Sequence, residues 1–260
     1  MPKNYNKYFT FIKVNNIPNI IRKIFVILLP NIFGSIKYKK YFKNKNGLEI
    51  GGPSNILKFE IPIYPVIKNL DSCNFSSITT WEGNISEGNN FNYFKNKHGF
   101  QFISEATDLH KIADETYDFV IASHCLEHCA NPIKAIKEWL RVIKKGAYIF
   151  LILPDPKYTF DINRPITTLQ HLINDYNLNT DETDLTHLEE ILNLHDLNKD
   201  HLAGTKDNFH NRCLNNFHNR CMHHHVFDID LLKSIFNHLN ITIKVVDFLK
   251  PHHLIILGTK

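Results

Sequence analysis

The stretch DETYDFVIASHCLEHCANPIKAIKEWLRVIKKGAYIFLILPD, residues 114–155, decides the fold of this chain. It contains one apolar run at Tyr117–Ser123 and a second at Ala147–Leu153. Runs that are apolar on both faces are typical of buried parallel strands, because a half-exposed strand alternates apolar with polar residues. Two such strands joined by a helix form a β-α-β unit, whose right-handed crossover makes the strands parallel in one sheet.

The segment between these two strands carries the signals of a well-defined helix. Asn131 is a suitable N-cap, and Pro132 fits the first helical position, where its missing N–H costs nothing. Apolar residues then recur at helical spacing along one face. Lys144 and Lys145 are favourable in a last turn, and Gly146 can close the helix in a left-handed conformation. These signals predict a helix that ends at Lys145.

Five more short apolar runs predict further strands. They are Leu48–Ile50, Val66–Asp71, Phe100–Ile103, Ile241–Phe248 and Leu254–Leu257. A short turn separates the last two, which is typical of an antiparallel hairpin at a sheet edge. We therefore predict an α/β fold with a Rossmann-like, seven-stranded, mostly parallel sheet. It would consist of five strand–helix units, a polar lid insertion at residues 156–235 and the C-terminal hairpin.

Charge is distributed unevenly along the chain. The net charge of the 260 residues is +4. Residues 1–46 contain ten Lys or Arg and no acidic residue, which leaves 20 basic and 26 acidic groups, or −6, for residues 47–260. We predict a basic N-terminal arm over 1–46 and a single domain over 47–260. The arm can contact an anionic membrane surface, whereas nucleic acid is disfavoured because the basic residues do not continue along the domain.

Localisation is indicated by the arm and by the cysteines. The most apolar segment of the arm, Ile24–Phe33, is about half as long as the ~20 residues that a bilayer crossing needs. Five cysteines without framework spacing argue against a secreted, disulfide-built fold. We therefore expect a cytoplasmic protein, with peripheral contact at the inner face of the membrane as an alternative.

Residues at the carboxyl ends of the strands are candidate binding residues, because ligands of open α/β sheets bind there. Gly51 and Gly52 follow the first strand and let a ligand approach the backbone where a Cβ would clash. Asp71, about 20 residues further on, can accept hydrogen bonds from both hydroxyls of a ribose. Asp108 can accept from the exocyclic amine of an adenine.

Three motifs resemble those of class I S-adenosylmethionine-dependent methyltransferases of the type 11 kind. They are EIGGPS at 49–54, EATDL at 105–109 and the stretch at 114–155. The resemblance implies S-adenosylmethionine as the methyl donor. The resemblance and the positions of the strand ends together give seven candidate donor-binding residues. They are Glu49, Gly51, Gly52, Asp71, Asp108, Ser123 and His124. Pro53 and Asn55 stand where the family has its second and third loop glycines.

The predicted insertion is rich in histidine and contains a near-perfect duplication. NFHNRCLN at 208–215 is followed directly by NFHNRCMH at 216–223, so the pattern H-x-x-C occurs twice. Nitrogen and thiolate ligands of this kind suit zinc, but tandem copies of a short polar segment also arise by sequence slippage. Both interpretations stay open, and the main prediction contains no metal.

Methyl transfer to an alcohol needs alignment of the reactants and a base for the departing proton. Histidine titrates near neutral pH, which makes His124, His224 and His225 the candidate catalytic residues. Glu127 and His128 are interpreted as residues that orient the turn after the fourth strand.

We therefore predict a methyltransferase that transfers a methyl group to a hydroxyl of a small polar acceptor, with a sugar as one candidate. Residues 159–176 resemble the lid of methyltransferases from surface-polysaccharide gene clusters, which implies a role in polysaccharide biosynthesis. Alternatives are a catalytically silent donor-binding module and a zinc-containing interaction module. A dinucleotide-dependent oxidoreductase is disfavoured, because the turn at Gly51–Pro53 lacks the G-x-G-x-x-G spacing.

Overall fold

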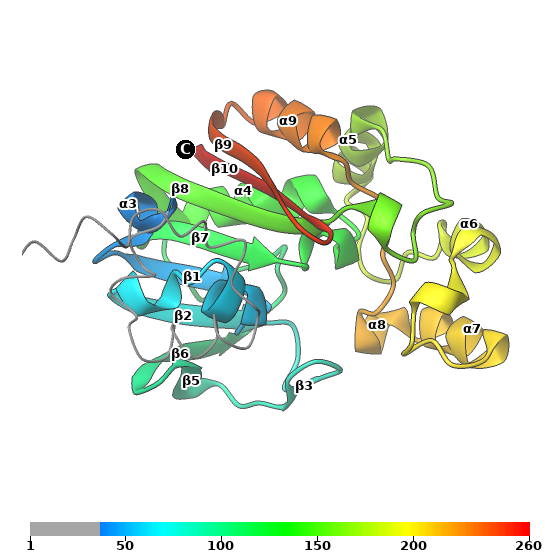
Figure 1. Ribbon diagram of the computed structural model, residues 1–260, viewed down its shortest axis with the longest axis horizontal. Coiled ribbons are helices and arrows are strands. Elements are labelled where there is room, and N and C mark those ends of the chain that lie inside the picture. The colour runs from blue at the N-terminus through cyan, green and yellow to red at the C-terminus, as the bar shows by residue number, and fades with distance from the viewer. Residues whose placement is uncertain (1–36) are drawn as a thin grey trace, which may run out of the picture.

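The computed structural model of this chain describes residues 37–260 (Figure 1). The apolar segment of the arm and its predicted membrane contact lie outside the described residues. The strands are β1 (Asn46–Ile50), β2 (Asn69–Asn74), β3 (Ile78–Thr79), β4 (Gly83–Asn84), β5 (Gly88–Phe94), β6 (Lys97–Ile103), β7 (Tyr117–Ser123), β8 (Ile143–Pro154), β9 (Thr242–Leu249) and β10 (His253–Thr259). The α-helices are α3 (Lys39–Phe42), α4 (Pro132–Val142), α5 (Leu169–Leu178), α6 (Leu188–Leu194), α7 (Lys206–Leu214), α8 (Asn216–Asn219) and α9 (Ile229–His238).

The main sheet has the strand order β5-β6-β2-β1-β7-β8-β10-β9. β1 pairs in parallel with β2 and β7, and the outer pairs β2–β6 and β7–β8 are also parallel. The hairpin β9–β10 is antiparallel and packs its second strand against β8. This confirms the predicted Rossmann-like, mostly parallel sheet with an antiparallel C-terminal hairpin. The carboxyl ends of the five parallel strands therefore meet along one edge.

The sheet has one strand more than the seven that the sequence predicts. β5 pairs antiparallel with β6 at the edge of the sheet, and two irregularities interrupt its register. Its sequence, GNNFNYF, buries only its aromatic side chains. An edge strand with one solvated face can carry this many asparagines, and its apolar signal is correspondingly weak.

The prediction of five strand–helix units is wrong for the first connections. Among the described residues, α4 is the only α-helix between two neighbouring parallel strands. β1 and β2 are joined by two short helices, η4 (Ile56–Glu60) and η5 (Tyr64–Val66). Pro62 and Pro65 explain this, because proline interrupts an α-helix. The chain from β2 to β6 forms the hairpin β3–β4 and the edge strand β5 in place of a helix.

Helix α4 begins as predicted and ends earlier. The side chain of Asn131 accepts a hydrogen bond of 3.0 Å from the backbone N–H of Lys134, so it is the N-cap. The helix ends at Val142, and Ile143 already begins β8. Gly146 has the left-handed conformation that the sequence predicts, with φ of 74°, but it lies within β8, near an irregularity of the β7–β8 register. The helix thus ends three residues before the predicted end, and the tertiary pairing with β7 starts two residues before it.

Two apolar layers cover the two faces of the sheet. In β8, Ile149 and Leu151 contact the layer formed with α4, α5 and α9, whereas Phe150 and Ile152 contact the layer formed with α3, η4 and η5. All four side chains are buried. Alternate residues of a strand point to opposite faces, so a run that is apolar throughout fits a strand covered on both sides, as predicted.

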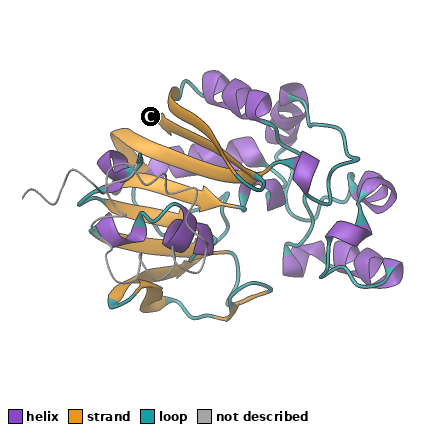
Figure 2. Ribbon diagram, in the orientation of Figure 1, coloured by secondary structure: helices purple, strands orange, loops and turns teal. Residues whose placement is uncertain are grey.

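The predicted insertion divides between the core and a separate overhanging part. α5 packs on α4, and α9 packs on both α5 and the C-terminal hairpin. We call residues 179–225 the lid. The lid contains α6, α7 and α8, which form a group beyond the carboxyl ends of the strands (Figures 1 and 2), and it has a small apolar core of its own around Phe209 and Ile191. α9, which the sequence analysis placed within the insertion, packs on the main domain.

The packed domain begins before the predicted boundary at residue 47. Tyr38, Tyr41 and Phe42 are buried in the layer on the η4 face, and the Phe42 ring lies 5.0 Å from that of Phe119 in β7. These three aromatic residues belong to residues 1–46, where the lysines suggested a basic arm outside the domain. In the described part of the chain, no helix is long and apolar enough to cross a membrane.

The assignment of α9 to the main core predicts a difference between two phenylalanines. Phe236 on α9 is completely buried, whereas Phe217 on α8 is 51% exposed. We expect Phe236→Ala to lower the free energy of unfolding by about 3–5 kcal/mol, because it leaves a cavity. Phe217→Ala is the matched control, with an expected loss below about 1 kcal/mol. Urea denaturation of both variants measures the free energy of unfolding. If both variants lost the same free energy of unfolding, the assignment of α9 to the main core would be contradicted.

Candidate functional site

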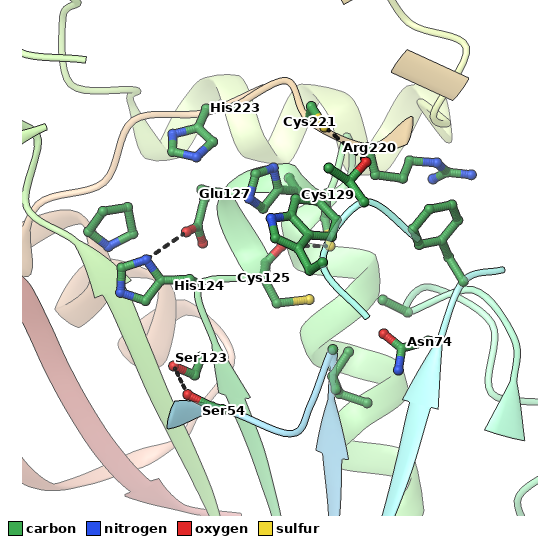
Figure 3. Close-up of a pocket in the computed structure, with 18 of the residues that line it drawn as sticks. Ser54, Asn74, Ser123, His124, Cys125, Glu127, Cys129, Arg220, Cys221 and His223 are labelled. Carbon is green, nitrogen blue, oxygen red and sulfur yellow. Dashed lines mark hydrogen bonds and ion pairs between the residues drawn. The ribbon is translucent and has the colours of Figure 1, made fainter. Parts of the chain in front are cut away.

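A cavity of about 920 Å³ lies between the carboxyl ends of the parallel strands and the lid. Residues that end or follow β1, β2, β6 and β7 line one side, and lid residues line the other. Figure 3 shows Ser54 and Ser123 at the strand ends, Arg220 and His223 on the lid, and Glu127 between them. This position matches the rule that open α/β sheets bind ligands beyond the carboxyl ends of their strands.

The loop after β1 is held from below by Glu49. The Tyr64 hydroxyl donates to the Glu49 carboxyl group, lying 2.8 Å from each oxygen, and the Ser54 backbone N–H donates to Oε1 over 3.2 Å. A Cβ on Gly52 would approach the Glu49 carboxyl carbon to 2.3 Å, so only glycine fits there. Gly51 lines the cavity and has a φ of 75°, which favours glycine. Glu49 and Gly52 thus shape the loop from beneath and do not line the cavity.

Burial sets the protonation of Glu49. The side chain is fully buried, and this burial raises its pKa to about 8, although the hydrogen bonds from Tyr64 and Ser54 favour the charged form. The carboxyl group is therefore largely neutral at pH 7, with no cation needed beside it.

Asp71 does not reach the cavity. Its carboxylate accepts hydrogen bonds from the Tyr117 hydroxyl, at 2.7 Å, and from the Phe100 backbone N–H, at 2.8 Å. β2 continues to Asn74, which lines the cavity and donates from Nδ2 to the Gly52 carbonyl over 3.3 Å. Asn74, and not Asp71, therefore stands at the carboxyl end of the second strand.

Asp108 is also outside the cavity. Its side chain is 61% exposed and contacts His110. The acid that lines the cavity after β6 is Glu105. Arg220 of the lid binds Glu105 through Nη2, at 2.7 Å from Oε1, and its Nη1 lies 3.2 Å from Glu182 of the lid. The lid is thus fixed to the β6 strand end by a buried guanidinium.

Ser123 and His124, two of the predicted donor-binding residues, line the cavity. The Ser123 and Ser54 hydroxyls lie 3.2 Å apart, joining the ends of β7 and β1. His124 has a positive φ of 50° and places Nε2 2.9 Å from Nδ1 of His253. Burial, and then the neighbouring His253, lower the pKa of His124 to about 3. The ring is therefore neutral at physiological pH.

Glu127 is the most unusual group in the cavity lining. The residue is 1% exposed, and neither carboxyl oxygen has a hydrogen-bond partner among the described residues. Nδ1 of the neutral His124 ring lies 3.7 Å from Oε1 (Figure 3). Burial raises the pKa of Glu127 to about 7, although the charge of His223 opposes this. The sequence indicated only a turn-orienting role for this residue.

The three consecutive histidines of the lid point into different surroundings. His223 lines the cavity, and its Nδ1 lies 2.6 Å from Asp161. His224 is completely buried away from the cavity, with Nε2 at 3.0 Å from Asn216 Nδ2. His225 is also buried and does not line the cavity; its Nε2 lies 3.2 Å from the Ala130 carbonyl. The two histidines predicted to be catalytic are thus not brought to the cavity, and their neighbour is.

The duplicated segments fold differently. The first copy forms α7 with Phe209 and Cys213 buried, whereas the second forms the short α8 and a turn. Both arginines, Arg212 and Arg220, line the cavity. Within residues 37–260, the histidines and cysteines of the two H-x-x-C patterns take part in no cluster of three ligand side chains. The structure does not form the zinc site that these patterns suggested.

Comparisons with known proteins point to the same fold and site. The sequence profile of a methyltransferase domain family matches residues 74–151. A solved structure from Rhodobacter sphaeroides, named as a Zn-dependent alcohol dehydrogenase, matches with a TM-score of 0.52, 12% identity and 88% coverage of each chain. A SAM-dependent methyltransferase from Thermotoga maritima matches with a TM-score of 0.45 and 16% identity, covering 93% of this chain and 99% of that one. No curated protein matches.

The sheet order, the strand-end cavity and the matched profile define a class I methyltransferase fold. Residues 74–151 match a methyltransferase domain, and this kind of domain implies S-adenosylmethionine as the methyl donor. The residues present fit such a donor, since a left-handed glycine, two hydroxyls and Asn74 converge on one cavity at the β1 and β2 ends.

The buried Glu49 carboxyl predicts a pH-dependent contribution to stability. Its folded-state pKa of about 8 lies above the ordinary 4.5, so its contribution is present below pH 4.5 and is lost as the pH rises toward 8. Glu49→Gln removes this titration. We expect the stability of the wild type relative to the variant to fall by about 1 kcal/mol per pH unit over this range. Chemical denaturation at pH 5, 6, 7 and 8 checks this; a constant difference would mean that Glu49 is ionised in the folded protein.

Proposed function

We propose that this protein transfers the methyl group of S-adenosylmethionine to a hydroxyl of a small polar acceptor bound beneath the lid, with Glu127 as the general base. The observation that carries this proposal is the buried Glu127 carboxyl group, which lines the cavity without a hydrogen-bond donor. A carboxyl group with a pKa near 7 is suited to accept a proton at neutral pH.

Glu127 is a better base than the histidines predicted from the sequence. A pKa of about 3 leaves His124 too weakly basic to hold a proton at neutral pH. His224 and His225 do not line the cavity. Glu127 has both oxygens available, and a hydroxyl placed against it would supply the missing donor. We assign His124 to the donor side, where it lies beside Ser123 at the end of β7.

The bound S-adenosylmethionine supplies an electrophilic methyl group on a sulfonium. The chain's residues hold the donor at the β1 and β2 ends, with Gly51 and Ser54 at the first and Asn74 at the second. Asn74 takes the place that the sequence gave to Asp71, and its amide can donate to and accept from the ribose hydroxyls. The lid excludes water from the acceptor side, which favours transfer over hydrolysis of the donor.

The chemistry of the lid supports a hydroxyl-rich acceptor. Arg212, Arg220, Asp200 and Glu182 line the cavity from the lid, so several donors and acceptors face the acceptor side. Trp81 lies on the opposite rim and is 51% exposed, which gives an apolar surface for the C–H face of a ring. A sugar has both features, and we propose it as the first candidate. The surface-polysaccharide role stays a prediction.

The affinity for S-adenosylmethionine tests whether Asn74 or Asp71 contacts the ribose of the donor. We expect Asn74→Ala to weaken S-adenosylmethionine binding about tenfold, because it removes a ribose contact and the hydrogen bond to Gly52. Asp71→Asn is the control, and its dissociation constant should stay within about twofold of the wild type. Isothermal titration calorimetry with S-adenosylmethionine and S-adenosylhomocysteine measures both. Equal weakening by the two substitutions would restore Asp71 as the ribose residue.

Activity and its pH dependence test Glu127. The acceptor is sought with methyl-labelled S-adenosylmethionine against monosaccharides, nucleotide sugars and phenols, with amines and thiols as comparison. With the acceptor found, we expect Glu127→Gln to lower kcat about 10²–10⁴-fold while donor affinity is unchanged. In the wild type, kcat/KM should rise with pH through about 7, as the carboxyl group loses its proton. His124, His128, His223 and Asp161 are the titratable groups around it among the described residues.

Glu127→Asp is the matched control, since it keeps the carboxyl group and should retain more activity than Glu127→Gln. Methylation of amines or thiols alone would contradict the hydroxyl acceptor. Donor binding without transfer to any acceptor would favour the silent donor-binding module.

A further inference from the structure

A second histidine cluster lies outside the cavity. Three histidines place possible ligand atoms close together: His171 on α5, His187 immediately before α6, and His225 at the end of the lid. Asp175 on α5 lies beside them, in contact with His171 and His225. His171 and Asp175 are four residues apart and therefore share one face of α5. None of the four side chains lines the cavity, and the proposed methyl transfer uses none of them.

The ligand atoms of this cluster converge on one point. Nε2 of His171 lies 3.0 Å from Nε2 of His187 and 3.4 Å from Oδ2 of Asp175. Nε2 of His225 lies 3.7 Å from the same carboxylate oxygen. Zinc bonds to nitrogen and oxygen of about 2.0–2.2 Å place the ligands of a tetrahedron about 3.3–3.6 Å apart. The three distances bracket this spacing.

The rings are oriented as they would be around a common centre. The interplanar angle is 74° between His171 and His187, 65° between His171 and His225, and 80° between His187 and His225. Three stacked rings would not aim three lone pairs at one point, and these rings are not stacked. A ligand atom of each of the three histidines lies within 4.8 Å of the others.

Two buried polar atoms of the cluster have no hydrogen-bond partner among the described residues. Oδ2 of Asp175 is buried and has no hydrogen-bond partner within residues 37–260. A buried carboxylate oxygen without a donor is costly, whereas a metal ion would satisfy it. Nδ1 of His225 has no partner either, and its Nε2 lies near the Ala130 carbonyl. In that contact Nε2 carries the hydrogen that it donates to the carbonyl oxygen, so metal binding at Nε2 would require this hydrogen to move to Nδ1.

We propose that His171, Asp175, His187 and His225 bind one zinc ion in a tetrahedral N₃O site. Imidazole and carboxylate ligands suit zinc, and four protein ligands leave no open position, which is typical of a structural site. His171 has a side chain that is 40% exposed, which gives the ion a route in.

The site would fix the lid to the main domain. α5 packs on α4 in the main core, while His187 and His225 belong to the first and last parts of the lid. A zinc ion would therefore join both ends of the lid to α5. His225 lies two residues after His223, so the same ion would also fix the segment that places His223 in the cavity.

The test uses the full chain, purified without a histidine tag and dialysed against metal-free buffer. We expect about one zinc per chain by mass spectrometry of the metal, either as purified or after addition of zinc chloride. His171→Gln and Asp175→Asn should lower zinc affinity at least tenfold. His210→Gln and Cys221→Ser, from the duplicated H-x-x-C patterns, are matched controls and should bind zinc as the wild type does.

Cobalt replacement identifies the ligands independently of any effect on folding. Cobalt(II) in this site should give the strong visible bands of tetrahedral coordination without a thiolate charge-transfer band. We also expect the melting temperature to rise on addition of zinc in the wild type and not in His171→Gln. A folded wild type that binds no zinc at micromolar concentration would overturn the proposal. A thiolate band lost in Cys221→Ser would overturn it in favour of the duplicated patterns.

Discussion

The methyl-donor loop depends on one buried carboxyl group. Glu49 lies beneath the loop and is held by Tyr64, which belongs to the apolar layer of α3, η4 and η5. The loop can pass over Glu49 only because residue 52 has no Cβ. A neutral carboxyl group costs far less to bury than a charged one, so burial and protonation are linked here. The shape of the donor site is thus connected to the core through the Glu49 side chain, which does not itself line the cavity.

The acceptor side depends on how the lid contacts the strand ends. Arg220 is nearly buried between Glu105 of the β6 loop and Glu182 of the lid, and its guanidinium lies 5.0 Å from the ring of Phe75. The His224 backbone N–H donates to the Glu127 carbonyl, which joins the lid to the turn after β7. Ion pairs with well-satisfied buried partners give a fixed geometry more than they give stability. They place the lid side chains opposite the Glu127 carboxyl group across the cavity.

The sequence predicted the strands of the sheet more accurately than the residues at their carboxyl ends, and the reason is physical. Apolar runs identify a buried strand but not its last residue. The second strand was predicted at Val66–Asp71 and lies at Asn69–Asn74, so its carboxyl end moved to Asn74, and Asp71 fell within the strand. β6 ends at Ile103, which brings Glu105 to the cavity in place of Asp108. Helix α4 and the hairpin have strong local signals and were found. Glu127 could not be recognised, because the absence of partners for a buried carboxyl group is a tertiary property.

The segment His223–His225 shows how one short run of sequence can serve three surroundings. It has no regular secondary structure, and each ring has a different partner: Asp161 for the first, Asn216 for the second, and Asp175 with the Ala130 carbonyl for the third. Side chains of an extended segment point alternately to opposite sides, so the three histidines cannot all enter one site. Identical residue types next to each other therefore carry separate roles. His225 of the second histidine cluster is only two residues after His223 in the chain. A constraint on the position of His225 therefore also restricts the position of His223 in the cavity. The histidine-rich composition therefore places one ring, that of His223, in the cavity and another, that of His225, in the proposed zinc site.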